Sequence, residues 1–260
     1  HRREANEYLA NLYITSKDYG RAMEAIVQTG MGTMAMREAY QRVAYFRAVE
    51  LFQVSDWSGA QEYFNKSLGY PQNLTFVALS HFWLGELAYR KGDAQEALAQ
   101  FESFLKTPGS YTLTERSTAL YNKAYCLYKL DRLEDAASGF RVYLQDAKPT
   151  DRKTFDATLR LADLYFLLGK HALAQEYYEK SVRNEPKGRY LGYAKYQQAL
   201  CMGLLGKDQQ KMDLLRKLSQ AKDGQDAFGG KYAEEALFEL AQTELRRGDN
   251  SAAEADFLQY

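Results

Sequence analysis

The stretch FWLGELAYRKGDAQEALAQF, residues 82–101, predicts two helices joined by a tight turn. Gly92 can adopt the left-handed conformation that ends a helix, and Asp93 can cap the helix that follows. Gly85 stands seven residues before the turn and Ala97 five residues after it. Small side chains at these places let the two helices approach each other closely. The stretch is therefore one helix-turn-helix unit.

The same unit recurs seven times along the chain. Its turns begin at spacings of 38, 37, 39, 38, 37 and 42 residues, at Lys17, Ser55, Gly92, Asp131, Gly169, Gly206 and Gly248. Seven residues before each turn stands a small residue: Ala10, Ala48, Gly85, Ala124, Ala162, Ala199 and Ala241. Five residues after it stand Ala22, Ala60, Ala97, Ala136, Ala174, Lys211 and Ala253, and nine after it the large residues Ile26, Phe64, Phe101, Phe140, Tyr178, Leu215 and Phe257. Three matching columns predict stacked helix pairs, each of which needs its neighbours to bury it.

The repeat fixes the expected layout. The first helix of each pair is expected near residues 3–15, 38–54, 75–91, 113–129, 151–168, 190–205 and 232–247, with the second helix after each turn. Residues 1–260 are expected to form a single solenoid that is part of a longer chain. An irregular linker is expected at 220–231, where three glycines and the longest spacing occur.

This pattern resembles the tetratricopeptide repeat family, whose unit is a helix-turn-helix of about 34 residues. The clearest matches are Phe82 to Gly85 with Ala97 and Phe101, and Leu161, Ala162, Tyr165, Gly169, Ala174, Tyr178 and Pro186. The unit here is longer, about 38 residues, with the extra residues between pairs. The resemblance implies an all-α fold, a right-handed superhelical α-solenoid of about seven repeats.

Composition excludes several function classes. Lys plus Arg and Asp plus Glu both number 34, so no net charge attracts the chain to nucleic acid. No apolar run is long enough to span a membrane. The histidines and the cysteines Cys126 and Cys201 form no metal-ligand or catalytic motif, and residues 224–231 depart from a phosphate-binding loop. We therefore expect no enzymatic activity, catalytic residue, metal site or cofactor, and two buried free thiols.

A partner site is expected on the first helices, which line the concave face of such solenoids. Helical periodicity places these side chains on that face: Tyr45, Phe46, Phe82, Trp83, Glu86, Tyr89, Tyr121, Asn122, Tyr125, Tyr128, Arg160, Asp163, Tyr193 and Tyr196. One interpretation is an aromatic groove for a peptide or a partner helix. The other is that these rings form the core between repeats.

The leading hypothesis is a scaffold that binds a protein or peptide partner. Residues 82–94 resemble repeats of bacterial envelope proteins, namely the periplasmic subunit of the Tol-Pal system and the lipoprotein of the barrel-assembly machine. This resemblance implies a periplasmic or outer-membrane-associated protein of envelope assembly, with a cytoplasmic location as the alternative. Two other functions stay open: a ligand-sensing arm of a larger signalling protein, and a glycan-contacting scaffold of polysaccharide export. The sequence leaves the oligomeric state open.

Overall fold

The structure is a computed structural model that describes residues 14–148, 151–184, 188–220 and 229–260. These residues belong to two compact units, 1–131 and 132–260. All the regular secondary structure within the described ranges is helical. The prediction of an all-α helical-repeat fold is confirmed.

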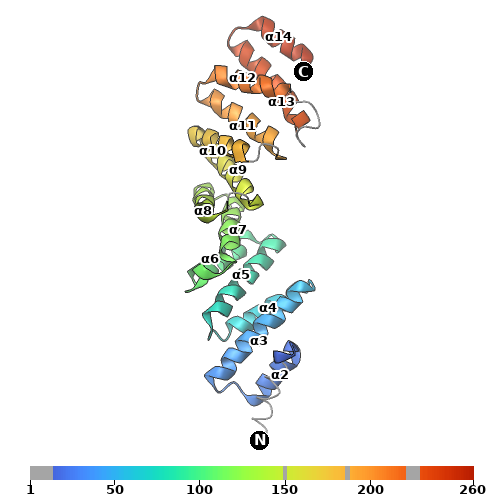
Figure 1. Ribbon diagram of the computed structural model, residues 1–260, viewed down its shortest axis with the longest axis vertical. Coiled ribbons are helices and arrows are strands. Elements are labelled where there is room, and N and C mark those ends of the chain that lie inside the picture. Colours follow the sequence, from blue (N-terminus) through green and yellow to red (C-terminus); the bar gives the residue numbers. More distant parts are fainter. Residues whose placement is uncertain (1–13, 149–150, 185–187, 221–228) are drawn as a thin grey trace. The chain divides into compact units, whose positions relative to one another are not determined.

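Unit 1 is a row of helices in which each packs against the next (Figure 1). Its elements are α2 (Tyr19–Thr29), α3 (Met34–Gln53), α4 (Trp57–Leu68), α5 (Leu74–Lys91), α6 (Ala94–Lys106), the 3-10 helix η1 (Ser110–Thr112) and α7 (Arg116–Lys129). The helices α3, α5 and α7 are the predicted first helices of their pairs. The helix expected near residues 3–15 lies almost entirely outside the described residues.

Unit 2 repeats the arrangement. Its helices are α8 (Leu133–Asp146), α9 (Arg152–Leu167), α10 (His171–Asn184), α11 (Leu191–Leu204), α12 (Asp208–Ser219), α13 (Gly229–Arg246) and α14 (Asn250–Gln259). The helices α9, α11 and α13 are the predicted first helices. Most of the linker expected at 220–231 lies outside the described residues, and α13 begins within its end at Gly229.

All seven predicted turns contain a residue with a left-handed backbone. The φ angles are 84° at Gly92, 69° at Gly169, 71° at Gly206 and 84° at Gly248, and also 60° at Lys17, 64° at Ser55 and 57° at Asp131. The next residue often caps the following helix: the side chain of Asp93, for example, accepts a hydrogen bond from the Glu96 amide at 3.0 Å. The backbone of the turn is therefore the same in every repeat, whichever residue occupies it.

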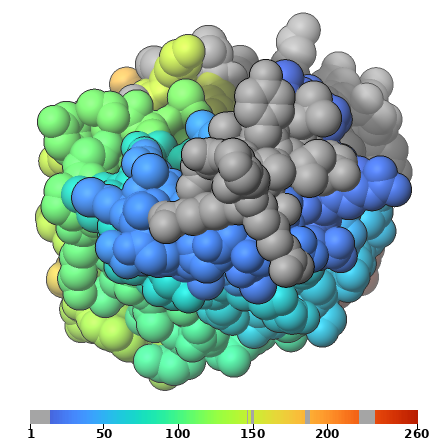
Figure 2. Space-filling view, turned by 90° about the horizontal axis from the view of Figure 1, so that it is seen from below, coloured from blue at the N-terminus to red at the C-terminus, as the bar shows by residue number. Residues whose placement is uncertain are grey.

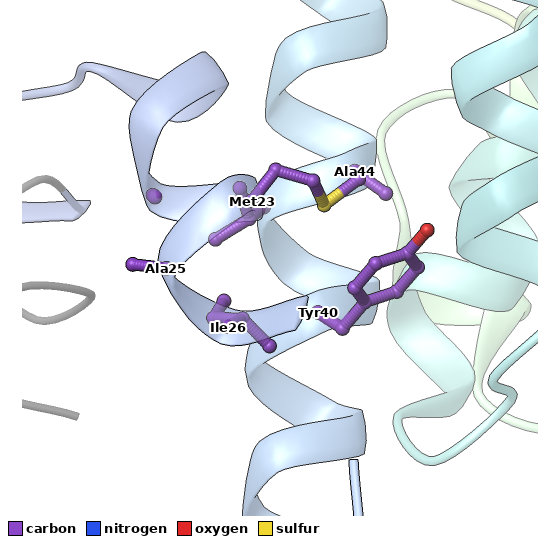
Figure 3. Packing of buried hydrophobic residues seen from close by; sticks show 7 residues of the cluster. Met23, Ala25, Ile26, Tyr40 and Ala44 are labelled. Atoms are coloured by element: carbon purple, nitrogen blue, oxygen red, sulfur yellow. The ribbon is translucent and has the colours of Figure 1, made fainter. Parts of the chain in front are cut away.

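The small and large columns build the core. The small residues of both columns that the structure describes are buried, and so are the large residues from Ile26 to Leu215. Phe257, in the last repeat, is 36% exposed, because no further helix pair follows it in the described residues. Figure 3 shows the part of this core between α2 and α3, in which Met23, Ala25 and Ile26 of α2 pack against Tyr40 and Ala44 of α3.

The surface of the N-terminal repeats is shown in Figure 2, where α2 and α3 appear in blue beside the cyan α4 and α5. None of the helices that the structure describes combines the length and the hydrophobicity needed to cross a lipid bilayer.

Candidate partner-binding surface

The predicted groove residues of unit 1 lie on three helices. Tyr45 and Phe46 belong to α3, the stretch from Phe82 to Tyr89 to α5, and the stretch from Tyr121 to Tyr128 to α7. Because the repeat is 37 to 39 residues long, equivalent residues occupy the same turn of each first helix.

Three of these residues are core residues. Tyr45 is 7% exposed, Phe82 5% and Asn122 8%. The Phe82 ring lies between rings of α6, with centroids 6.2 Å from Phe101 and 5.7 Å from Phe104. Burial raises the pKa of the Tyr45 hydroxyl above its ordinary value. For these three side chains the interpretation as core between repeats holds.

The other predicted residues of unit 1 are half-buried: Phe46, Trp83, Glu86, Tyr89, Tyr121, Tyr125 and Tyr128. Several of them make contacts within or between the first helices. The Trp83 indole N–H donates a hydrogen bond to the Tyr45 hydroxyl at 3.2 Å, and the Asn122 amide donates one to the Glu86 carboxylate. The Tyr121 and Tyr125 ring centroids lie 5.0 Å apart on α7. Each ring therefore packs on one side and leaves part of its surface to solvent.

Rings and cations alternate along the C-terminal halves of the first helices. The Arg90 guanidinium of α5 lies 5.1 Å from the centroid of the Phe52 ring of α3, and the Lys129 ammonium of α7 lies 4.3 Å from that of the Tyr89 ring of α5. In both pairs the ring stands three residues before a turn and the cation two residues before the next turn. Cations hold such positions by attraction to the ring quadrupole.

A pocket of about 350 Å³ opens beside this series. Phe52 and Trp57 form one wall, with ring centroids 5.0 Å apart, and Trp83 lies 4.7 Å from Phe52. Arg90 lies at the edge, 5.4 Å from the Trp57 ring centroid. We call Phe46, Phe52, Trp57, Trp83, Tyr89, Arg90, Tyr121, Tyr125, Tyr128 and Lys129 the aromatic surface.

Sequence reasoning found Trp83 in this pocket but missed Phe52, Trp57 and Arg90. The sequence does contain a signal for these residues. It appears when the repeats are aligned and the positions three and two residues before each turn are compared. In unit 1 the first column reads Ile14, Phe52, Tyr89 and Tyr128, and the second reads Thr15, Gln53, Arg90 and Lys129.

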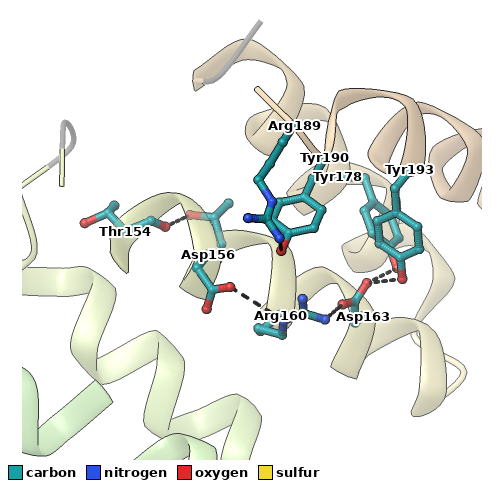
Figure 4. A network of polar contacts seen from close by, with 9 residues as sticks. Thr154, Asp156, Arg160, Asp163, Tyr178, Arg189, Tyr190 and Tyr193 are labelled. Atoms are coloured by element: carbon teal, nitrogen blue, oxygen red, sulfur yellow. Dashed lines mark hydrogen bonds and ion pairs between the residues drawn. The ribbon is translucent and has the colours of Figure 1, made fainter. Parts of the chain in front are cut away.

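In unit 2 the structure brings the predicted residues Arg160, Asp163 and Tyr193 together, with Asp163 at the centre (Figure 4). One carboxylate oxygen of Asp163 accepts hydrogen bonds from the hydroxyls of Tyr178 and Tyr193, each at 2.8 Å. The other oxygen accepts from the Arg160 guanidinium, also at 2.8 Å. Burial raises the pKa of the Asp163 carboxyl above its ordinary value, although these partners favour the charged form. Asp163 thus joins α9 to α10 and α11.

Tyr193 and Tyr196 continue the unit 2 face towards α13. Both are half-buried, and their ring centroids lie 5.7 Å and 5.8 Å from that of Tyr232. Burial raises the pKa of Tyr196 to about 12, so the hydroxyl is neutral at physiological pH. The unit 2 face therefore carries tyrosine hydroxyls, whereas the corresponding face of unit 1 carries tryptophan and cationic side chains.

The two thiols, and the histidines His81 and His171 within the described residues, have structural roles. Burial raises the pKa of Cys126 to about 12 and of Cys201 to about 11, so both stay protonated. The His81 ring makes a hydrogen bond of 2.7 Å with the Gln100 amide oxygen, and the His171 ring packs on Phe166. Within the described ranges no group of three or more His, Cys, Asp and Glu side chains is arranged to hold a metal ion.

The fold and this surface define a helical-repeat protein of antiparallel helix pairs. Two segments, residues 46–112 and residues 156–187, match family models described as tetratricopeptide repeat. The chain therefore contains tetratricopeptide repeats. Such repeats are generally non-catalytic scaffolds for proteins, and this class of fold indicates protein partners.

Solved structures share the fold at low identity. The apo form of RapI has a TM-score of 0.61 and 13% identity, covering all of this chain and 75% of RapI. A MamA fragment from Desulfovibrio magneticus RS-1 has a TM-score of 0.53 and 17% identity, covering 70% of this chain and 92% of the fragment. The repeats of a putative kinesin light chain from Podosopora anserina have a TM-score of 0.52 and 16% identity, covering 69% of this chain and 91% of that structure. No curated protein matches the chain significantly.

Proposed function

We propose that the chain is a non-catalytic scaffold whose aromatic surface binds an extended segment of a partner protein. The observation that carries the proposal is the pocket of about 350 Å³ between α3, α4 and α5, which Phe52, Trp57 and Trp83 line. Large aromatic side chains give contact area at low entropic cost and are enriched at the centres of protein interfaces. The pocket is therefore suited to one large apolar side chain of the partner.

The cations add a second requirement for the partner. Arg90 and Lys129 are both exposed and lie over rings of neighbouring helices. An acidic residue of the partner, placed next to the apolar side chain, would pair with the guanidinium of Arg90. We propose a partner segment that combines a large apolar or aromatic residue with acidic neighbours.

A sharp test uses the two tryptophans of the chain. Trp57 and Trp83 are the only tryptophans in the sequence, and both line the pocket. Peptides selected from a random display library against the whole chain should combine an aromatic residue with acidic ones and should change the tryptophan emission on binding. Arg90→Glu should weaken them about tenfold, since it reverses one charge-assisted contact. The control Gln95→Glu, which adds one negative charge on an exposed part of α6, should bind like wild type.

The proposal fails if the selected peptides leave the tryptophan emission unchanged and bind the Arg90→Glu variant as tightly as wild type. Oligosaccharides that change the emission in place of peptides would instead support the glycan-contacting scaffold.

We also propose a periplasmic or outer-membrane-associated location in bacterial envelope assembly. The support is the resemblance of residues 82–94 to repeats of envelope proteins. The two free thiols are compatible with an oxidising compartment because they are buried. Osmotic shock of the native cells should release the protein or leave it with the outer membrane. Recovery in the cytosolic fraction alone would contradict this location.

A further inference from the structure

Unit 2 departs from the repeat at Lys211. The position five residues after the turn holds alanine in all the other repeats, at Ala22, Ala60, Ala97, Ala136, Ala174 and Ala253. Lys211 nevertheless stays in the interior and is 4% exposed. A lysine at a position built for a methyl group needs space and an electrostatic partner.

Gly203 provides the space. Three residues before the turn, four other repeats carry a ring, at Phe52, Tyr89, Tyr128 and Phe166, whereas this repeat carries Gly203. A Cβ atom at Gly203 would lie 2.9 Å from Cδ and 3.2 Å from Nζ of Lys211. The lysine side chain therefore runs against the bare backbone of α11, where a larger residue would exclude it.

The ammonium group is only partly satisfied. Its Nζ donates to the Glu239 carboxylate of α13 at 2.5 Å. An ammonium has three donors, and no second acceptor for Lys211 occurs among the residues that the structure describes. Two buried donors thus stay available for a ligand.

Lys211 and its partner Glu239 both line a pocket of about 490 Å³. Phe166, Leu200 and Leu204 are its apolar lining residues. The Arg246 guanidinium also lines the pocket and lies 3.3 Å from the Glu239 oxygen that Lys211 contacts. The volume lies within the range of small-molecule sites, about 300 to 1,000 Å³. The pocket accommodates a group of several atoms.

The charges around the pocket favour an anion. Lys211, Arg246 and Arg247 are cationic, while Glu239 and Asp208 are anionic, and the Arg247 guanidinium lies 3.8 Å from the Asp208 carboxylate. The lining therefore carries one more positive than negative charge. Arg246 is exposed, so it can turn towards a ligand without any change in the core.

The pocket has a counterpart in unit 1. It occupies the same repeat positions as the pocket of the aromatic surface: Gly203 corresponds to Phe52, Asp208 to Trp57, Glu239 to Trp83 and Arg246 to Arg90. One location on the repeat thus carries aromatic chemistry in unit 1 and charged chemistry in unit 2.

We propose that the unit 2 pocket binds a carboxylate group of an acidic protein segment, with Lys211 as the central donor and Arg246 as the second. A carboxylate offers two acceptor oxygens, which match the free protons of Lys211 and the fork of Arg246. The apolar side holds the methylene groups of a glutamate side chain. This site is separate from the aromatic surface and does not depend on it.

The test measures binding of fluorescent oligopeptides to the whole chain by anisotropy. The probes are oligoglutamate with both ends blocked, blocked oligoglutamine, and oligoglutamine with a free C-terminal carboxylate. Blocked oligoglutamate should bind about tenfold or more tightly than blocked oligoglutamine, because charge-assisted hydrogen bonds replace neutral ones. Tight binding of the third probe would identify a terminal rather than a side-chain carboxylate as the ligand and overturn the assignment of an acidic side chain.

Two variants test the role of Lys211. Lys211→Met keeps the length of the side chain, removes the charge and should abolish the preference for oligoglutamate. Lys217→Met, at an exposed position of the same helix α12, makes the same change in net charge and should bind like wild type. If Lys211→Met unfolds unit 2, the double variant Gly203→Phe with Lys211→Ala restores the residue types of the other repeats and should fold without binding.

Equal binding of oligoglutamate and oligoglutamine by wild type would overturn the proposal, as would full binding by the double variant. Because both tryptophans lie in unit 1, oligoglutamate bound in unit 2 should leave their emission unchanged. The tryptophan emission therefore distinguishes a failure of the carboxylate site in unit 2 from a failure of the proposed peptide site in unit 1.

Discussion

The ring of Phe101 lies against the backbone of Gly85, so that a Cβ atom at position 85 would stand 2.9 Å from the ring carbons Cδ1 and Cε1. This distance is shorter than a real Cβ contact. The close approach of α5 and α6 therefore requires glycine at this position.

Gly85→Ala tests that requirement. In an exposed helix the change would stabilise by about 1 kcal/mol, but here overpacking should destabilise by about 1 to 3 kcal/mol. Urea unfolding followed by tryptophan emission measures the effect, because both tryptophans lie in unit 1. Gly85→Ala combined with Phe101→Leu should recover part of the loss. A more stable single variant would contradict the close contact.

Ser55→Gly should stabilise unit 1. Ser55 has a φ of 64°, and a left-handed backbone costs a residue with a side chain about 1 kcal/mol. The expected gain is about 1 kcal/mol in the free energy of unfolding. Ser138→Gly is the matched control: it places the same change on an exposed face of α8 and should lose about 0.5 to 1 kcal/mol. Destabilisation by Ser55→Gly would show that the serine itself is needed in the turn.

Asp163→Ala should destabilise unit 2 by about 3 kcal/mol, since it removes the acceptor of the Tyr178 and Tyr193 hydroxyls and one of the two carboxylates beside the Arg160 guanidinium. Asp163→Asn should cost less, because the amide oxygen still accepts from the tyrosines. Chemical unfolding followed by circular dichroism gives both values. The exposed pair of Arg132 and Asp135 supplies the control, and Asp135→Ala should change stability by less than about 1 kcal/mol.

The pH dependence of the same residue has a definite sign. Burial raises the pKa of Asp163 in the folded chain above its ordinary value of 3.8. Its ionisation therefore opposes folding, and its contribution to stability is complete below pH 3.8 and declines as the pH rises through the folded pKa. The difference in stability between wild type and Asp163→Asn should shrink over that window. A difference that grows with pH would contradict a raised pKa.

Cys126 should resist alkylation by iodoacetamide in the folded chain. Its pKa of about 12, against an ordinary 9.0, makes its thiolate fraction about a thousandfold smaller at neutral pH. Reaction at pH 8 should follow unfolding in urea. A rate in the native protein close to that of a small free thiol would contradict the burial.

Column comparison predicted the turns and the core because both follow from the repeat. Glycine marked four turns directly, whereas Lys17, Ser55 and Asp131 were identified by spacing alone. Their left-handed φ values are imposed by the packing of the helices on either side, which local sequence preference does not reveal.

The surface was harder to predict than the core. Neighbouring positions on one helix face differ in burial, as with the buried Phe82 and the half-buried Trp83. Periodicity locates a face but not its edge, because the edge depends on how closely the next pair packs. The contact of Lys129 with Tyr89 joins residues 40 apart in the sequence. Sequence columns show that a ring and a cation recur at these positions, and the folded stack shows that they touch.

The burial of Cys126 and Cys201 also bears on how the chain can be made. Both thiols are enclosed by packed helices and hold no disulfide. Their helices are held by apolar packing and hydrogen bonds rather than by a disulfide, so the folding of these helix pairs has no oxidative step. The folded state of these helix pairs is therefore independent of whether the surrounding medium is reducing or oxidising.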